Sequence, residues 1–174
     1  MIKRVLDEVT RELPAIKTAA TLSPMPGFRK WVERRIEVGD DILLTSAEKR
    51  ALKELTKGGQ PLSEILATTW QRDEKMAEAL RQPLTRMAAV YLLSARDQSD
   101  QPVDRIARFH LRNGARVERL NFLADTSSQG MRQSYGMMVN YRYKPGDIEA
   151  NHEAFRGETR IVASNTVKSL PPPA

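Results

Sequence analysis

Two side chains in this sequence could share acid–base chemistry, the hydroxyl of Ser23 and the imidazole of His110. Ser23 lies in ATLSPMPGF (20–28), directly before Pro24. A residue that precedes proline is pushed out of the helical region, so we expect Ser23 to be extended and held on a stiff support. The stretch lacks the G-x-S-x-G pattern of a nucleophile elbow, and an ordinary strand-to-helix turn is the alternative interpretation.

His110, in RFHLRNGAR, is the better acid or base candidate of the two histidines. Imidazole, with an ordinary pKa of about 6.5, can hold or release a proton near neutral pH. A lone histidine can also be purely structural. His152, in EANHEAF, falls in a charged helical surface pattern. Members of a catalytic triad meet in space rather than in sequence, so spacing alone identifies no third residue.

Other chemistries find little support in the sequence. There are no cysteines, and neither histidine has metal-ligand partners one helical turn away on a shared face, so we expect no metal site. The nucleotide-binding patterns G-x-x-x-x-G-K-[ST] and G-x-G-x-x-G do not occur. We therefore expect neither a nucleoside triphosphate enzyme nor a dinucleotide enzyme.

Composition points to one domain and to an anionic partner. The chain has 174 residues, 40% of them hydrophobic, and a formal net charge of +6. That charge suits nucleic acid, an acidic membrane or a phosphate-bearing small molecule. The arginines are scattered among acidic residues and aromatics make up 6%, which argues against nucleic acid. With no long apolar segment or signal peptide, the sequence predicts a soluble, cytoplasmic protein.

The elements that must position Ser23 and His110 follow from periodicity and turn signals. These predict a mixed α+β domain in which the middle is mostly helical. Thr45 and Glu48 form a capping-box pattern, whereas the first helix has no capping residue before it. Helices are expected at 2–13, 28–37, 46–57, 63–70, 73–81, 84–93 and 102–112, and strands at 18–22, 116–123 and 137–143.

Five blocks in this order resemble the C-terminal part of the malonyl-CoA decarboxylase family. The resemblance runs from residue 2 to about residue 170, and its two longest blocks are the most specific. The blocks are LSPMPGF, RMAAVYLL, ARFHLRNGARVERLNFLADTS, GMRQSYGMMVNYRY and ANHEAF.

The resemblance implies that malonyl-CoA is converted to acetyl-CoA and carbon dioxide, in fatty-acid and malonate metabolism. It also implies an acetyltransferase-like (GNAT-like) fold of the mixed α/β class, with inserted helices. The family's catalytic serine and histidine fall on Ser23 and His110, and a tyrosine of the same site falls on Tyr143. No cofactor is implied, because the coenzyme A thioester is the substrate and its carbonyl can accept the released electrons. His110 is the expected proton donor.

The same resemblance sets the expected domain organisation. Residues 1–170 would be the C-terminal part of the catalytic domain, and 171–174 a disordered tail. Family members place further strands and a glycine-containing, pyrophosphate-binding turn before the segment that matches 2–13, so we expect this chain to be an N-terminally truncated form. Unpaired sheet edges would then favour a homo-oligomer or association with the missing part. The alternatives are an inactive coenzyme A binding or interaction fragment and a basic nucleic-acid-binding domain.

Overall fold

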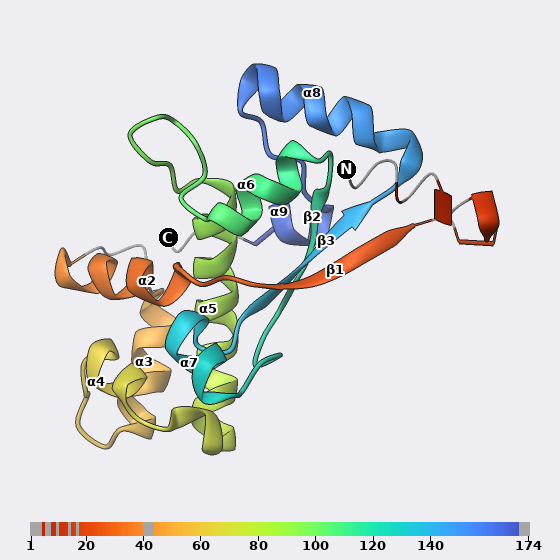
Figure 1. Cartoon of the computed structure of the whole chain (residues 1–174). Helices are drawn as coiled ribbons and strands as arrows, with labels where there is room; N and C mark the ends of the chain where they lie inside the picture. Colours follow the sequence, from red (N-terminus) through yellow and green to blue (C-terminus); the bar gives the residue numbers. More distant parts are fainter. Residues whose placement is uncertain are drawn as a thin grey trace.

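The sheet that carries Ser23 is antiparallel and has the strand order β1–β3–β2 (Figure 1). A computed structural model describes residues 5, 8–9, 11–13, 15–16, 18–39 and 44–170. Within those residues the sheet has three strands: β1 (Ala19–Pro24), β2 (Arg116–Asn121) and β3 (Met138–Tyr143). Each lies on a segment that the sequence predicts to be extended. Two segments from the second half of the chain thus join one from the first.

Strand register decides which side chains share a face. Thr21 lies opposite Tyr141 and Ser23 opposite Val139. Because side chains alternate along a strand, the odd-numbered residues of β1 and β3 point to one face, which packs against the helices. A register shift between Val117 and Arg119 on β2 explains the loose alternation of its sequence.

Among the described residues, ten helical segments follow β1 or lie between the later strands and beyond them, in addition to the helical residues before position 13, and their arrangement can be seen in Figure 1. The long helix α5 crosses the sheet, with α6 and α8 toward one end of the molecule and α2, α3, α4 and α7 toward the other. Their bounds are α2 (Phe28–Glu37), α3 (Ser46–Leu55), α4 (Leu62–Ala67), η2 (Trp70–Arg72), α5 (Glu74–Leu93), α6 (Arg105–Arg112), α7 (Ser128–Ser134), η3 (Pro145–Asp147), α8 (Ile148–Glu158) and α9 (Asn165–Lys168).

The helix expected at 28–37 is α2, and the capping box of α3 is present. Thr45 Oγ1 accepts the Glu48 backbone N–H at 3.2 Å, and the Glu48 carboxylate accepts the Thr45 N–H at 2.8 Å. These two bonds satisfy donors that the first turn of a helix leaves without partners. The sequence prediction of this helix start is confirmed.

Two helix predictions need correction. The separate helices expected at 73–81 and 84–93 form the single helix α5, which continues through Pro83. A proline inside a helix removes one backbone hydrogen bond, but Pro83 and its neighbours Leu80 and Leu84 are buried, and this packing holds the helix together. The segment expected at 63–70 is also divided, because α4 ends at Ala67 and a short 3₁₀ turn follows.

Smaller differences concern the ends of elements. The helix expected from residue 102 begins at Arg105, because the Asp104 side chain caps it. The strand expected at 18–22 extends through Ser23 to Pro24. Val5, Glu8, Val9, Arg11 and Glu12 of the expected helix at 2–13 have helical backbone. Most of that helix's other positions, and the tail at 171–174, lie outside the described residues.

The hydrophobic core joins α5 to the sheet and to α2. Phe28, Trp31 and Tyr91 form an aromatic group with ring centroids 5.6 to 6.4 Å apart. An ion pair links two helices at the edge of this core, from Arg86 on α5 to Glu48 at the start of α3, at 2.6 Å. Leu22, on the opposite face of the sheet, is 55% exposed.

In the part of the chain that the structure covers, no helix is long and apolar enough to cross a membrane.

Candidate active site

β1 holds the Ser23 hydroxyl on the face of the sheet that the helices cover. Ser23 lies near the end of the strand, where Pro24 keeps its backbone extended, and its side chain is only 6% exposed. Thr21, two residues earlier on the same face, places its Oγ1 2.9 Å from Ser23 Oγ. The strand and its Thr21 side chain therefore orient the serine hydroxyl independently of the helices.

α6, one of the helices that cover this face, carries His110 to the Ser23 hydroxyl. Asp104 starts the helix by accepting the Ala107 backbone N–H at 2.8 Å, and Tyr91 on α5 donates its hydroxyl to the same carboxylate at 3.0 Å. The Asp104 side chain is buried, and this burial raises the pKa of its carboxyl group. The cap and the tyrosine together fix the start of the helix that carries the imidazole.

Ser23, His110 and Tyr143 form a continuous hydrogen-bonded chain. Ser23 Oγ lies 3.1 Å from His110 Nε2, and His110 Nδ1 lies 2.7 Å from Tyr143 Oη. His110 is 8% exposed and Tyr143 is 2% exposed. The three residues that the resemblance selects are thus brought together, although Ser23 and His110 are 87 positions apart.

Burial sets the protonation of this chain. It lowers the pKa of His110 below its usual value, and it raises the pKa of Tyr143 to about 12. At neutral pH the imidazole is therefore neutral and the phenol keeps its proton. A neutral imidazole has one N–H donor and one acceptor nitrogen, so the hydrogen bonds between Ser23, His110 and Tyr143 have two possible donor–acceptor arrangements. Either Tyr143 donates to Nδ1 and Nε2 donates to Ser23, or both bonds run in the opposite direction, and interchange of the two moves protons along the chain.

The site contains residues that the sequence interpretation missed. The Tyr141 ring stacks on His110 with centroids 4.3 Å apart and planes 19° apart, and Thr21 bonds to Ser23. Both were detectable from alternation, because Tyr141 lies two residues before Tyr143 and Thr21 two before Ser23. The role of Asp104 had a weaker signal, a helix-capping residue three positions before Ala107.

His152 lies outside this chain of hydrogen bonds. It belongs to α8, and its Nδ1 donates to the Arg112 carbonyl oxygen at 2.6 Å. Among the described residues, no group of three or more histidine, aspartate or glutamate side chains could hold a metal ion. The three side chains of the Ser23–His110–Tyr143 site present a hydroxyl, an imidazole and a phenol.

Comparison with known proteins gives one consistent family. Residues 1–173 match the family described as the malonyl-CoA decarboxylase C-terminal domain. Two relatives, both called mitochondrial malonyl-CoA decarboxylase, come from Anser anser anser and Rattus norvegicus and are 38% and 37% identical. Each alignment covers 98% of this chain, but 35% and 36% of the relative. The chain thus spans about a third of the length of these relatives.

Two solved structures point to the same family. The crystal structure of malonyl-CoA decarboxylase from Rhodopseudomonas palustris superposes with a TM-score of 0.86 at 46% identity, covering 99% of this chain and 37% of that one. The enzyme from Agrobacterium vitis gives a TM-score of 0.83 at 41% identity, covering 97% of this chain and 39% of that one. The similarity therefore extends over the whole sheet and the helices around it.

Proposed function

This chain belongs to the malonyl-CoA decarboxylase family, and we propose that it converts malonyl-CoA to acetyl-CoA and carbon dioxide at the Ser23–His110–Tyr143 site. The observation that carries the proposal is the buried hydrogen-bonded chain from the serine through both imidazole nitrogens to the tyrosine. Its residues come from β1, α6 and β3, so the fold holds all three groups without a loop that must first become ordered.

The reaction needs few protein groups because the substrate carries its own electron acceptor. The bond between the carboxylate carbon and the α-carbon breaks, carbon dioxide leaves, and the electron pair passes into the thioester carbonyl to give an enolate. A proton then adds to the α-carbon. The protein must align the breaking bond with the carbonyl, shield it from water and supply the proton. On these grounds we expect no metal or other cofactor to be required.

His110 supplies that proton in our proposal. Its low exposure keeps it neutral in the free site, but a malonyl carboxylate beside the imidazole would favour the protonated form. Ser23 hydrogen-bonds the departing carboxylate or relays a proton from Nε2, and Tyr143 holds Nδ1 and so fixes the ring. A correctly placed general acid accelerates a reaction by roughly a hundred- to ten-thousandfold.

Three finer proposals accompany this function. We propose an acetyltransferase-like fold, supported by the antiparallel β1–β3–β2 arrangement with a helix-borne histidine over one face. We propose that residues 1–170 act as the C-terminal part of a catalytic domain. The cytoplasmic location expected from the sequence also stays a prediction. The names of the two animal relatives place those proteins in mitochondria, so they do not support it. Imaging of the tagged protein in its source cells would test the last point.

The test is release of carbon dioxide from malonyl-CoA that is radiolabelled in its free carboxyl group. We expect turnover by the purified chain, a loss of at least about a hundredfold in Ser23→Ala and His110→Ala, and no change in Ser99→Ala, an exposed serine in the loop before α6. Turnover within a few-fold of wild type in both site variants would contradict the assignment. Binding of malonyl-CoA without any release would support the coenzyme A binding alternative.

A further inference from the structure

The hydrogen-bonded chain of the active site has a fourth member at its serine end, where Thr21 Oγ1 lies 2.9 Å from Ser23 Oγ. Among the described residues, this contact is the one hydrogen bond of the Thr21 hydroxyl. The serine, the histidine and the tyrosine are buried, whereas Thr21 is half-buried. Thr21 is therefore the member of the chain through which the other three can exchange protons with water.

Side chains from the two other strands fix the position of Thr21. Asn140 on β3 donates its Nδ2–H to the Thr21 carbonyl oxygen at 2.8 Å, and Asn121 on β2 donates to Asn140 Oδ1 at 2.8 Å. These bonds add to the strand pairing that sets Thr21 opposite Tyr141. Since side chains two positions apart on a strand point to the same face, a fixed Thr21 keeps its hydroxyl beside Ser23.

Burial decides in which direction the hydrogen bonds of this chain run. If His110 carries its proton on Nδ1, that N–H donates to Tyr143, and the tyrosine O–H is then buried without an acceptor among the described residues. If Nε2 carries the proton, the tyrosine donates to Nδ1, the imidazole to Ser23 and the serine to Thr21. The last O–H then belongs to the half-buried threonine, where water can accept it. An unpaired buried donor is costly, so the second arrangement is favoured.

The proposed decarboxylation consumes one proton in each turnover. Carbon dioxide leaves without a proton, and the α-carbon of the enolate gains one from protonated His110, which returns to its neutral form. A proton from solvent must therefore reach the imidazole before the next turnover. Along the chain, the Ser23 proton moves to Nε2, the Thr21 proton moves to the serine oxygen, and hydronium supplies the threonine oxygen. Both hydroxyl groups are neutral again at the end.

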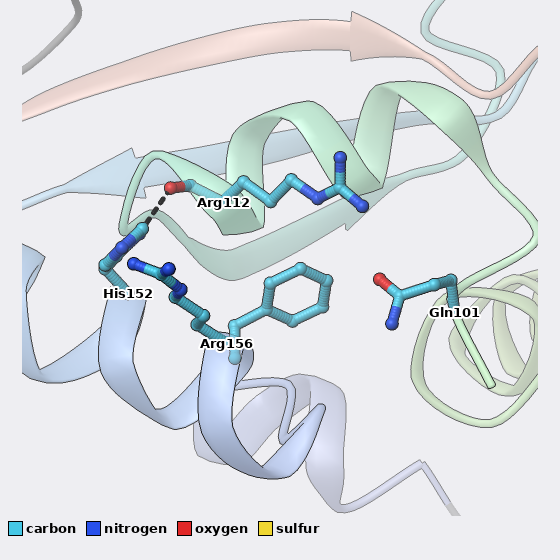
Figure 2. A pocket seen from close by; sticks show the side chains of 5 residues that line it. Gln101, Arg112, His152 and Arg156 are labelled. Atoms are coloured by element: carbon cyan, nitrogen blue, oxygen red, sulfur yellow. Dashed lines mark hydrogen bonds between the residues drawn. The ribbon is translucent and has the colours of Figure 1, made fainter. Parts of the chain in front are cut away.

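The second histidine is not connected to this chain within the described residues. Figure 2 shows His152 on α8 beside the end of α6, where its Nδ1 donates to the Arg112 carbonyl oxygen. None of the described residues that line the cleft around it belongs to the active-site chain. Thr21 is thus the connection to solvent that the hydrogen bonds of the structure provide.

We propose that Thr21 is a positioning residue, which keeps the proton of neutral His110 on Nε2 and passes protons from solvent to the imidazole through Ser23. Its part in turnover rests on the function proposed above, whereas its effect on the imidazole proton does not. Two substitutions separate the hydroxyl from the shape of the side chain. Thr21→Val keeps the shape and lacks the hydroxyl, and Thr21→Ser keeps the hydroxyl. Thr166→Val, at an exposed threonine on α9, is the control.

Nitrogen-15 NMR of the full chain without substrate tests the position of the proton. We expect wild-type His110 to be protonated on Nε2. Thr21→Val removes the acceptor of the serine O–H, so the serine should donate to Nε2 instead, and the ratio of the Nδ1–H to the Nε2–H form should rise at least about tenfold. Thr21→Ser and Thr166→Val should match wild type. A wild-type imidazole protonated on Nδ1, or a Thr21→Val spectrum equal to that of wild type, would overturn the inference.

Turnover of malonyl-CoA tests the proton relay. Thr21→Val should lower kcat at least about tenfold at an unchanged KM, with a larger solvent deuterium isotope effect, because proton delivery becomes slow. Thr21→Ser should stay within about twofold of wild type, since its hydroxyl can still relay. Circular dichroism should show Thr21→Val folded, because valine favours strands. A Thr21→Val kcat equal to that of wild type would contradict the relay.

The two measurements separate this inference from the proposed function. If the wild-type chain releases no carbon dioxide from malonyl-CoA, the decarboxylase proposal fails, and with it the role of Thr21 in turnover. The NMR comparison then still decides whether Thr21 directs the imidazole proton. If wild type and Thr21→Val turn over equally, the decarboxylase proposal stands and the relay through Thr21 is wrong.

Discussion

The hydroxyl of Tyr91 occupies the space in which a side chain at Gly27 would begin. A Cβ built on Gly27 would lie 2.6 Å from Tyr91 Oη, and that same hydroxyl donates to Asp104 at the start of α6. Gly27 belongs to the turn that follows Ser23, and Asp104 caps the helix that carries His110. The tyrosine therefore links the serine turn to the histidine helix through a contact that only glycine permits.

Gly27→Ala should lower the free energy of unfolding by about 1–3 kcal/mol, because the new methyl group must displace a buried tyrosine from its hydrogen bond. Urea denaturation followed by circular dichroism measures this change. Gly157→Ala is the matched control. A Cβ there meets nothing within 4 Å, and alanine favours the helix, so that variant should be unchanged or more stable by up to about 1 kcal/mol. Equal stabilities of the two variants would contradict the proposed contact.

Tyr143→Phe and Tyr141→Phe should differ, although both remove a buried hydroxyl from β3. Tyr143 is the partner of His110 Nδ1, so its loss leaves a buried nitrogen unsatisfied and should cost about 1–3 kcal/mol of stability and at least about tenfold in turnover. The Tyr141 hydroxyl is buried with no hydrogen-bond partner among the described residues, and its ring stacking needs no oxygen. Unfolding and decarboxylation measurements should show Tyr141→Phe close to wild type.

Stability should fall in mild acid partly through His110. Burial lowers its folded-state pKa below the unfolded value of about 6.5, so the unfolded state binds a proton first as pH decreases. The contribution of His110 is therefore complete above about pH 6.5 and is lost as pH falls through the folded-state pKa. His110→Gln should lose less stability than wild type between about pH 7.5 and pH 5. Proton NMR of the imidazole would report the same titration directly. If the stabilities of wild type and His110→Gln had the same pH dependence, the prediction would be wrong.

Glu48→Ala should be far more damaging than Glu78→Ala. Glu48 pairs with the buried Arg86 and also accepts the Thr45 N–H, so its removal leaves a buried guanidinium without that partner and should cost about 3–5 kcal/mol. Glu78 pairs with Arg81 at 2.8 Å, but both side chains are more than half exposed, and such pairs contribute less than about 1 kcal/mol. Thermal unfolding of the two variants checks the difference, and similar midpoints would show that the buried pair adds little.

Helix and strand positions were largely predictable because their signals are local. The capping pair Thr45 and Glu48 fixed the start of α3, and the strand-forming run at 137–143 became β3 within one residue. Pro83 shows the limit of such signals. A proline normally interrupts a helix, and only the surrounding core, absent from any short window of sequence, keeps α5 continuous.

The sequence alone determined that Ser23 is extended before its proline, that His110 lies on a helix ending at Asn113 and Gly114, and that Tyr143 lies on a late strand. These follow from backbone sterics and capping, which act over a few residues. Only the tertiary structure decided that the three side chains meet and that Thr21 and Tyr141 join them. Ser23 and His110 are 87 residues apart, and their 3.1 Å contact depends on strand register and helix packing, which the whole core sets together.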